Sequence, residues 1–198
     1  MKRKEVKILG LSYSQDQMGS YILVLSERKG KVKIPIIVKA SEVQRIALQL
    51  EDIKSTRPLT HDIFKSVTDS YGIDIQEVYI YSLAEGIFYT KLITSNGVEE
   101  VEVECSIGDG VILSSIYKCP IYMETSVMNA AGVVINDDGT PIDEVDEFSD
   151  DESDDKSDIK VVSVENLEKM LEEALKNEDY DIAIAVRDRI AELKDKSK

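Results

Sequence analysis

Hydrophobic and polar positions divide the first 135 residues into short strands and helices. Six segments show the alternation or the apolar runs expected of strands: 6–12, 20–26, 31–38, 75–82, 86–94 and 98–105. Helical spacing predicts three helices: one opening at Ser41, one running from Thr60 toward Gly72, and one near 108–117. A short strand over Pro120–Met123 and one or two helical turns within 124–131 complete this part of the chain.

The same order of elements occurs twice. Similar residues recur at a constant offset of 67 positions: Gly19 and Gly86, Tyr21 and Phe88, Leu25 and Leu92, Gly30 and Gly97, Ile34 and Val101, Ile36 and Val103, Glu42 and Asp109, Ile46 and Leu113. Val6 to Leu11 also resembles Val78 to Leu83. Two β-β-β-α units predict an α+β domain whose mostly antiparallel sheet is covered by helices, because hairpin-connected strands leave an apolar face to bury.

Charge is distributed unevenly along the chain. The 198 residues carry a net charge of −15, yet residues 1–45 carry +6 and residues 137–158 carry −11. The acidic run contains almost no apolar residues and cannot bury enough surface to offset its ordering entropy. We therefore expect a domain over 1–135, a disordered acidic linker over 136–160 and a helical segment over 161–198.

Two interpretations stay open for each charged segment. The lysines of residues 1–45 either face phosphate or form an ordinary solvated surface. The linker either is a solubilising spacer or competes with nucleic acid for the basic segment. In the second case, replacing its acids with Ser and Gly should tighten nucleic-acid binding at low salt.

Several classes of site do not occur in the sequence. Cys105 and Cys119 form no zinc pattern with the single histidine, so we expect free core thiols. No phosphate-binding loop, nucleophile elbow or dinucleotide fingerprint is present. The sequence also contains no run of eighteen apolar residues and no secretion signal. We therefore expect a cytoplasmic protein that does not enter a membrane.

The stretch Thr56-Arg57-Pro58-Leu59-Thr60-His61-Asp62 contains the only histidine and lies between the two repeats. Thr60 has the side chain of an N-cap, which predicts a loss of about 1 kcal/mol on Thr60→Ala. Asp62 would then lie in the first turn of the helix, and Arg, Thr, His and Asp would gather at one helix N-terminus, a natural anion site. The alternative is that these residues only cap the helix and that His61 is exposed.

Five segments together resemble the bifunctional nuclease domain family over about residues 5–135. They are Ile34-Pro35-Ile36 with Ser41-Glu42, Arg57 to Asp62, Val78 to Leu83 with Glu85 to Tyr89, Ile107 to Gly110, and Pro120-Ile121. The resemblance implies a small α+β domain that cleaves both RNA and DNA. The chain departs from the family where members typically show an acid, a small residue and Arg-Pro-Ser-Asp-Ala. Residues 104–110 keep both acids, but Ser106 stands in place of the arginine.

Phosphodiester hydrolysis needs a proton acceptor or a metal-bound hydroxide, and positive charge at the phosphoryl oxygens. The candidate catalytic residues are His61, Asp62 and Arg57. The candidate substrate-binding residues are Thr60, Lys29, Lys31 and Lys33, and the candidate ligands for Mg²⁺ or Mn²⁺ are Glu85, Glu104 and Asp109. The alternative for each of these acids is an ordinary turn or surface residue.

The C-terminal segment resembles the UVR motif, a helical hairpin found in UvrB and UvrC. The residues that carry the likeness are Leu167, Leu171, Ala174, Glu178 to Asp181, Ala183, Arg187, Asp188, Ile190 and Leu193. Helical spacing places Leu167, Met170, Leu171, Ala174 and Leu175 on the inner face of one helix, and Tyr180, Ala183, Ile184, Arg187 and Ile190 on that of the other. So short a hairpin buries too little surface to be stable alone. We expect the Leu167–Leu193 hairpin to pair with a second copy of the chain, giving a homo-oligomer, or with another protein.

The sequence thus favours a nuclease that hydrolyses RNA, DNA or both and carries a C-terminal interaction hairpin. The competing interpretation is a non-catalytic adaptor or regulatory module that oligomerises and docks partners through the hairpin.

Overall fold

The computed structural model describes residues 2–13, 21–28, 30–51, 53, 55, 57–134 and 164–196. The first repeat consists of β1 (Arg3–Tyr13), β2 (Tyr21–Glu27), β3 (Val32–Val38) and α1 (Ala40–Leu50). The second consists of β4 (Asp74–Ala84), β5 (Ile87–Ser95), β6 (Glu100–Cys105) and α3 (Ile107–Tyr117). Between them lies α2 (Thr60–Ser70), so the predicted duplication of a β-β-β-α unit is confirmed.

A short strand joins the two repeats into one sheet. This strand, β7 (Ile121–Glu124), pairs antiparallel with β1 and parallel with β4. Val6 and Val78, which the sequence comparison had matched, both lie opposite Ile121, one on each side. The chain then forms α4 (Thr125–Ala131) and the unpredicted strand β8 (Val133–Val134), which pairs with β3. The described strands form one sheet in the order β6-β5-β4-β7-β1-β2-β3-β8, which confirms the mostly antiparallel α+β fold.

Close contact between α3 and the sheet depends on small residues. A Cβ atom at Gly110 would lie 3.0 Å from the Val78 side chain and 3.1 Å from that of Thr90. Gly110 therefore lets the helix backbone approach β4 and β5. Val111, Ile112 and Leu113 follow in the same helix and are buried in the core.

The helices α1 and α3 meet at their N-terminal ends. A Cβ atom at Gly108 would lie 2.7 Å from the carboxyl carbon of Glu42, so the first turn of α3 lies against the first turn of α1. Glu42 and Asp109 are equivalent in the repeat, and each is the third residue of its helix after the N-cap. The duplication therefore brings two equivalent acidic first turns together.

The C-terminal segment forms the expected helical hairpin, with α5 (Val164–Lys176) and α6 (Tyr180–Lys196). Its buried face differs from the prediction, because Leu175, Tyr180 and Ile184 are exposed and Arg187 lies at the surface. Leu167, Met170, Ala174, Ala183 and Ile190 are buried as predicted, and Ile182 and Val186 are buried in addition.

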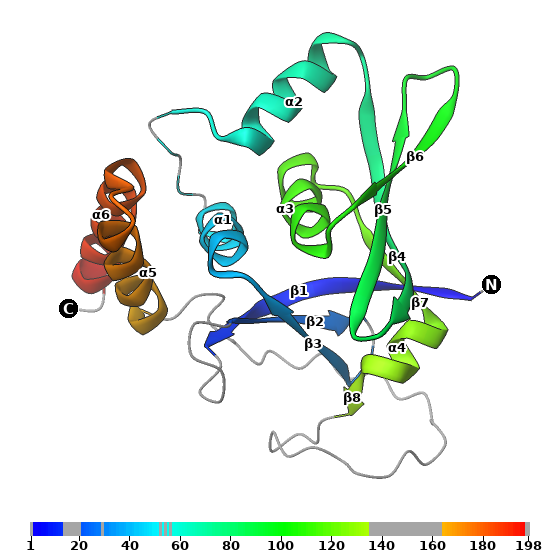
Figure 1. Cartoon of the computed structure of the whole chain (residues 1–198), viewed down its shortest axis with the longest axis horizontal. Helices are drawn as coiled ribbons and strands as arrows, with labels where there is room; N and C mark the ends of the chain where they lie inside the picture. The colour runs from blue at the N-terminus through cyan, green and yellow to red at the C-terminus, as the bar shows by residue number, and fades with distance from the viewer. Residues whose placement is uncertain are drawn as a thin grey trace.

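The hairpin packs against its own domain, beside α1 in Figure 1. Its buried side chains belong to the same continuous apolar cluster as the core of the sheet. Polar contacts also hold it there: Tyr21 donates a hydrogen bond to Glu173 (2.9 Å), and Arg189 donates two to Glu51 (2.9 and 3.1 Å). The domain thus covers one face of the hairpin, and the expected pairing with a second copy of the chain or with another protein stays a prediction.

The acidic linker expected over 136–160 lies outside the described residues. Among the described helices, none combines the length and the apolar character needed to cross a membrane.

Candidate active site

His61 of α2 and Asp109 of α3 form a polar pair that joins the first turns of the two helices. Nε2 of His61 lies 3.0 Å from Oδ1 of Asp109. The imidazole side chain is only 16% exposed, whereas the Asp109 side chain is half exposed. The interpretation of His61 as an exposed first-turn residue is therefore wrong, because its ring packs between α2 and α3.

The first turn of α3 holds Asp109 in place. Ser106 is the N-cap of α3, and its hydroxyl oxygen accepts a hydrogen bond from the Asp109 backbone N–H (3.0 Å). The same hydroxyl donates to Oδ2 of Asp109 at 2.8 Å, which leaves Oδ1 to face the imidazole. Ser106, the residue that departs from the family pattern, thus fixes the carboxylate as an N-cap serine does.

The two imidazole nitrogens differ in their surroundings. Since a carboxylate accepts hydrogen bonds, the geometry assigns a proton to Nε2. Nδ1 is buried and has no hydrogen-bond partner within the described part of the chain. In the neutral ring with its proton on Nε2, Nδ1 carries the lone pair and is the nitrogen that can accept a proton.

The start of α2 differs by one residue from the prediction. Leu59 is the N-cap and Thr60 is the first helical residue, exposed to solvent. Asp62 supplies the capping interaction, because its Oδ2 accepts a hydrogen bond from the Leu59 backbone N–H at 2.8 Å. The prediction that Thr60 caps the helix is wrong. Its proposed contact with substrate stays a prediction.

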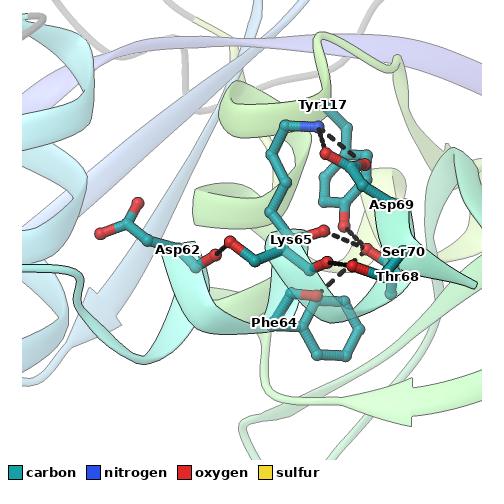
Figure 2. Close-up of polar contacts among 8 residues, drawn as sticks. Asp62, Phe64, Lys65, Thr68, Asp69, Ser70 and Tyr117 are labelled. Carbon is teal, nitrogen blue, oxygen red and sulfur yellow. Dashed lines mark hydrogen bonds and ion pairs between the residues drawn. The ribbon is translucent and has the colours of Figure 1, made fainter.

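The second half of α2 docks on α3 (Figure 2). Lys65 forms an ion pair with Asp69 at 3.0 Å and lies over the ring of Tyr117, 4.6 Å from its centroid. The buried Thr68 hydroxyl also hydrogen-bonds to the Tyr117 hydroxyl. In Figure 2 the Asp62 carboxylate points away from these contacts. Docking through Tyr117 sets the rotation of α2 so that His61, on the same side, faces Asp109.

Two arginines interact with acidic residues of the hairpin turn. The Arg57 side chain is 85% exposed, and its Nε lies 3.8 Å from Oδ2 of Asp181. Burial lowers the pKa of Arg45, against the opposing charges of Asp62 and Asp179. Sequence reasoning missed Arg45, because nothing in the spacing of α1 shows that α2 and the hairpin turn approach the same side of that helix.

The three candidate metal ligands lie in different places. The carboxylate of Glu104 accepts a hydrogen bond from the Tyr81 hydroxyl at 2.7 Å. The next residue, Cys105, lies against α3, so strand alternation puts Glu104 on the opposite face of the sheet from Asp109. Glu85 lies in the turn between β4 and β5, with a φ of 52°. Among the described residues, no group of three His, Cys, Asp or Glu side chains is arranged to hold a metal ion.

The candidate lysines are distant from the imidazole along β3. Lys31 directly precedes this strand and Lys33 is its second residue, whereas α1 follows its end. At about 3.3 Å per strand residue, Lys33 lies roughly 20 Å from Lys39, which precedes α1. Lys29 is outside the described residues. Substrate contacts by these lysines stay a prediction.

Both cysteines are free and half-buried. Burial raises the pKa of Cys105 to about 12 and that of Cys119 to about 11. The thiols are therefore protonated at neutral pH and are poor nucleophiles.

The fold and the contact between α2 and α3 define a duplicated α+β domain with a histidine–carboxylate pair, His61 and Asp109. Residues 23–136 match the family model of the bifunctional nuclease domain, and residues 162–196 match that of the UvrB/uvrC motif. Two uncharacterized proteins of Mycobacterium tuberculosis, MT1877 (strain CDC 1551 / Oshkosh) and Rv1829 (strain ATCC 25618 / H37Rv), are each 34% identical over 134 residues. These matches cover 68% of this chain and 79% of each relative. The chain belongs to the bifunctional nuclease domain family and carries a C-terminal UvrB/uvrC motif.

Proposed function

We propose that the protein is a nuclease that hydrolyses phosphodiester bonds of RNA, DNA or both. Membership of the bifunctional nuclease domain family supports this activity class. The observation that carries the proposal is the His61–Asp109 pair, since it joins a proton acceptor to a carboxylate that Ser106 holds in place.

His61 acts as the general base through Nδ1, the nitrogen that is not directed at Asp109. Asp109 orients the ring and stabilises the imidazolium that forms when Nδ1 takes a proton from the attacking water. General acid–base catalysis by a positioned side chain contributes typically about 10²- to 10⁴-fold to the rate. Because Nδ1 is buried, substrate binding must move the Arg57–Asp62 segment enough to admit a water molecule.

Arg57 contacts the phosphoryl oxygens in this proposal, because its guanidinium is exposed and offers a planar set of donors. A divalent cation, Mg²⁺ or Mn²⁺, fits Asp109 as a single protein ligand supplemented by substrate phosphate, a mode that Mg²⁺ commonly uses. Such an ion would stabilise charge on the phosphate. Glu104 instead binds the Tyr81 hydroxyl on the other face of the sheet and Glu85 lies in the β4–β5 turn, so neither is assigned to this ion.

A non-catalytic adaptor is the second candidate, and one observation favours it. Leu175, Tyr180 and Ile184 of the hairpin are 49 to 60% exposed, so the hairpin keeps apolar surface after it has packed on the domain. Exposed apolar side chains near one another are typical of protein-interaction surfaces. In this function the hairpin docks a partner protein or a second copy, and the domain serves as its support.

A substrate and metal panel separates the two functions. Purified full-length protein is incubated with end-labelled single-stranded RNA, single-stranded DNA and duplex DNA, in EDTA, Mg²⁺ or Mn²⁺. Cleavage that appears with the metal and stops with EDTA supports a metal-assisted nuclease. Cleavage that persists in EDTA removes the metal from the proposal, and no cleavage under any condition favours the adaptor.

A further inference from the structure

The strand β6 lies at one end of the described sheet, where β5 is its only neighbour. It pairs with β5 over every residue from Glu100 to Cys105 without a bulge. Natural sheets usually protect an exposed edge with a proline, a lysine, a bulge or a covering segment. The sequence of β6 contains neither proline nor lysine. Its outer edge therefore offers main-chain N–H and C=O groups to a further strand.

The first repeat shows that the fold accepts a strand at this position. β3 is the equivalent of β6, and β8 pairs antiparallel with it at Val32 and Lys33. Pro35 follows in β3 and has no N–H to donate to a strand beyond this start. At the offset of 67 residues, Glu102 takes the place of Pro35. Within the described sheet, β6 has no counterpart of β8, so a strand can be added along its whole length.

The side chains of β6 form two faces of different chemistry. Cys105 lies toward α3, because a Cβ atom at Gly110 would be 3.4 Å from its Sγ atom. By strand alternation Val101 and Val103 lie on the same face, and they are 47% and 44% exposed. The three side chains on the opposite face are all acidic: Glu100, Glu102 and Glu104. The sequence from 96 to 106 contains no basic residue. An added strand would meet apolar side chains on one face and carboxylates on the other.

A lysine on β5 shows how a cation on an adjacent strand uses the acidic face. Lys91 Nζ lies 2.6 Å from Glu102 Oε2, and the Glu102 side chain is still 60% exposed. Opposite charges on neighbouring strands stabilise a sheet, whereas like charges directly opposite destabilise it. Antiparallel pairing of β6 with β6 of a second copy would bring two acidic rows together on one face. The charge pattern therefore favours a basic partner strand over a second copy.

We propose that β6 is a docking edge for an extended segment of a partner protein, which adds an antiparallel strand of alternating basic and apolar residues. Its lysine or arginine side chains pair with the three glutamates, and its apolar side chains cover Val101 and Val103. Main-chain hydrogen bonds supply affinity, and the alternation supplies specificity. The edge lies on the side of the molecule away from the α5–α6 hairpin in Figure 1, so it is a separate surface.

The test uses the full-length protein and a fluorescein-labelled peptide of the sequence Lys-Val-Lys-Val-Lys-Val-Lys. Anisotropy at low salt measures its affinity, and hydrogen–deuterium exchange of residues 99–105 measures protection of the β6 amides. A second peptide, Lys-Lys-Lys-Lys-Val-Val-Val, has the same composition and charge without the alternation. The exchange experiment needs no variant, so it tests strand addition directly on the parent protein.

Two variants with equal loss of charge test the acidic face. The edge variant combines Glu100→Gln, Glu102→Gln and Glu104→Gln. The control variant removes three exposed carboxylates from the α5–α6 hairpin instead: Glu168→Gln, Asp188→Asn and Glu192→Gln. Circular dichroism checks that both variants are folded like the parent.

The alternating peptide should slow exchange in residues 99–105 of the parent, and the peptide without alternation should not. The edge variant should bind the alternating peptide roughly tenfold more weakly than the parent, as expected for the loss of three exposed ion pairs. The control variant should bind like the parent. Raising the salt concentration should weaken binding to the parent more than binding to the edge variant.

Equal affinities for the edge variant and the control variant would overturn the proposal, because binding would then follow net charge alone. Binding that leaves the exchange of residues 99–105 unchanged would overturn it as well, since no strand would have been added. A parent that sediments as a dimer, and whose β6 amides exchange faster on dilution, would show that a second copy occupies the edge instead.

Discussion

Nε2 of His61 and Oδ1 of Asp109 lie 3.0 Å apart although the two residues are 48 positions apart in the chain. His61 belongs to the helix between the repeats, and Asp109 to the closing helix of the second repeat. The pair therefore exists only when α2 is docked on α3 through Tyr117, and any activity that needs it depends on this packing.

The first prediction concerns the start of α2. Asp62→Ala should lower the free energy of unfolding by about 1 kcal/mol, because it removes the acceptor for the Leu59 backbone N–H. Thr60→Ala should change it by less than about 0.5 kcal/mol, as a surface substitution at a first helical position does. Urea unfolding followed by circular dichroism measures both. Equal losses for the two variants would contradict the capping described here.

The second prediction concerns the hydrophobic core that the hairpin shares with the domain. Leu167→Ala should cost about 2–5 kcal/mol, since the Leu167 side chain is fully buried in the common core. Leu175→Ala, on the same helix but 51% exposed, should cost much less and serves as the control. Thermal unfolding should show one transition that moves to lower temperature in Leu167→Ala. Two separate transitions, with only the smaller one shifted, would mean that the hairpin does not share the domain core.

The third prediction concerns pH. The pKa values of Cys105 and Cys119 are raised from 9.0 to about 12 and about 11, mainly by burial. Between pH 9 and pH 11 the folded chain therefore binds more protons than the unfolded chain, and the free energy of unfolding falls as pH rises. Each thiol contributes at most about 1.4 kcal/mol per pH unit.

Denaturant unfolding of the parent and of Cys105→Ala with Cys119→Ala tests this at pH values spanning that window. Stability of the double variant should fall less steeply with pH than that of the parent. Parallel curves would show that the thiols ionise equally in the folded and unfolded states.

The duplication could be predicted from sequence because each repeat has its own apolar alternation, turn glycines and helix start. Val6 and Val78 illustrate this, since the sequence match reappears as two pairings with Ile121. Burial was less predictable. Ile34 and Val101 occupy equivalent positions, but Ile34 is fully buried whereas Val101 is 47% exposed, because β6 is the edge strand of the sheet.

The candidate site was predictable only in part. The sequence identified His61 and Asp109 as separate candidates, one for proton transfer and one for metal binding. Their contact depends on the angle at which α2 docks on α3. The residues next to His61 and Asp109 in the sequence do not determine that angle. Arg45 could not be found for the same reason. Glu104 was selected for its place in the family pattern, but strand alternation turns it to the other face of the sheet.

The most direct test of the proposed nuclease is the initial rate of RNA cleavage by the parent, His61→Ala and Ser70→Ala, purified in parallel and assayed with Mg²⁺ or Mn²⁺. Ser70 lies at the other end of α2, where its hydroxyl donates to the Ser66 carbonyl, so its variant controls for copurifying nucleases and for changes in the helix. His61→Ala should lower the rate at least about 100-fold, while Ser70→Ala should cleave like the parent. Cleavage by His61→Ala at the rate of the parent would contradict the assignment of His61 as the general base.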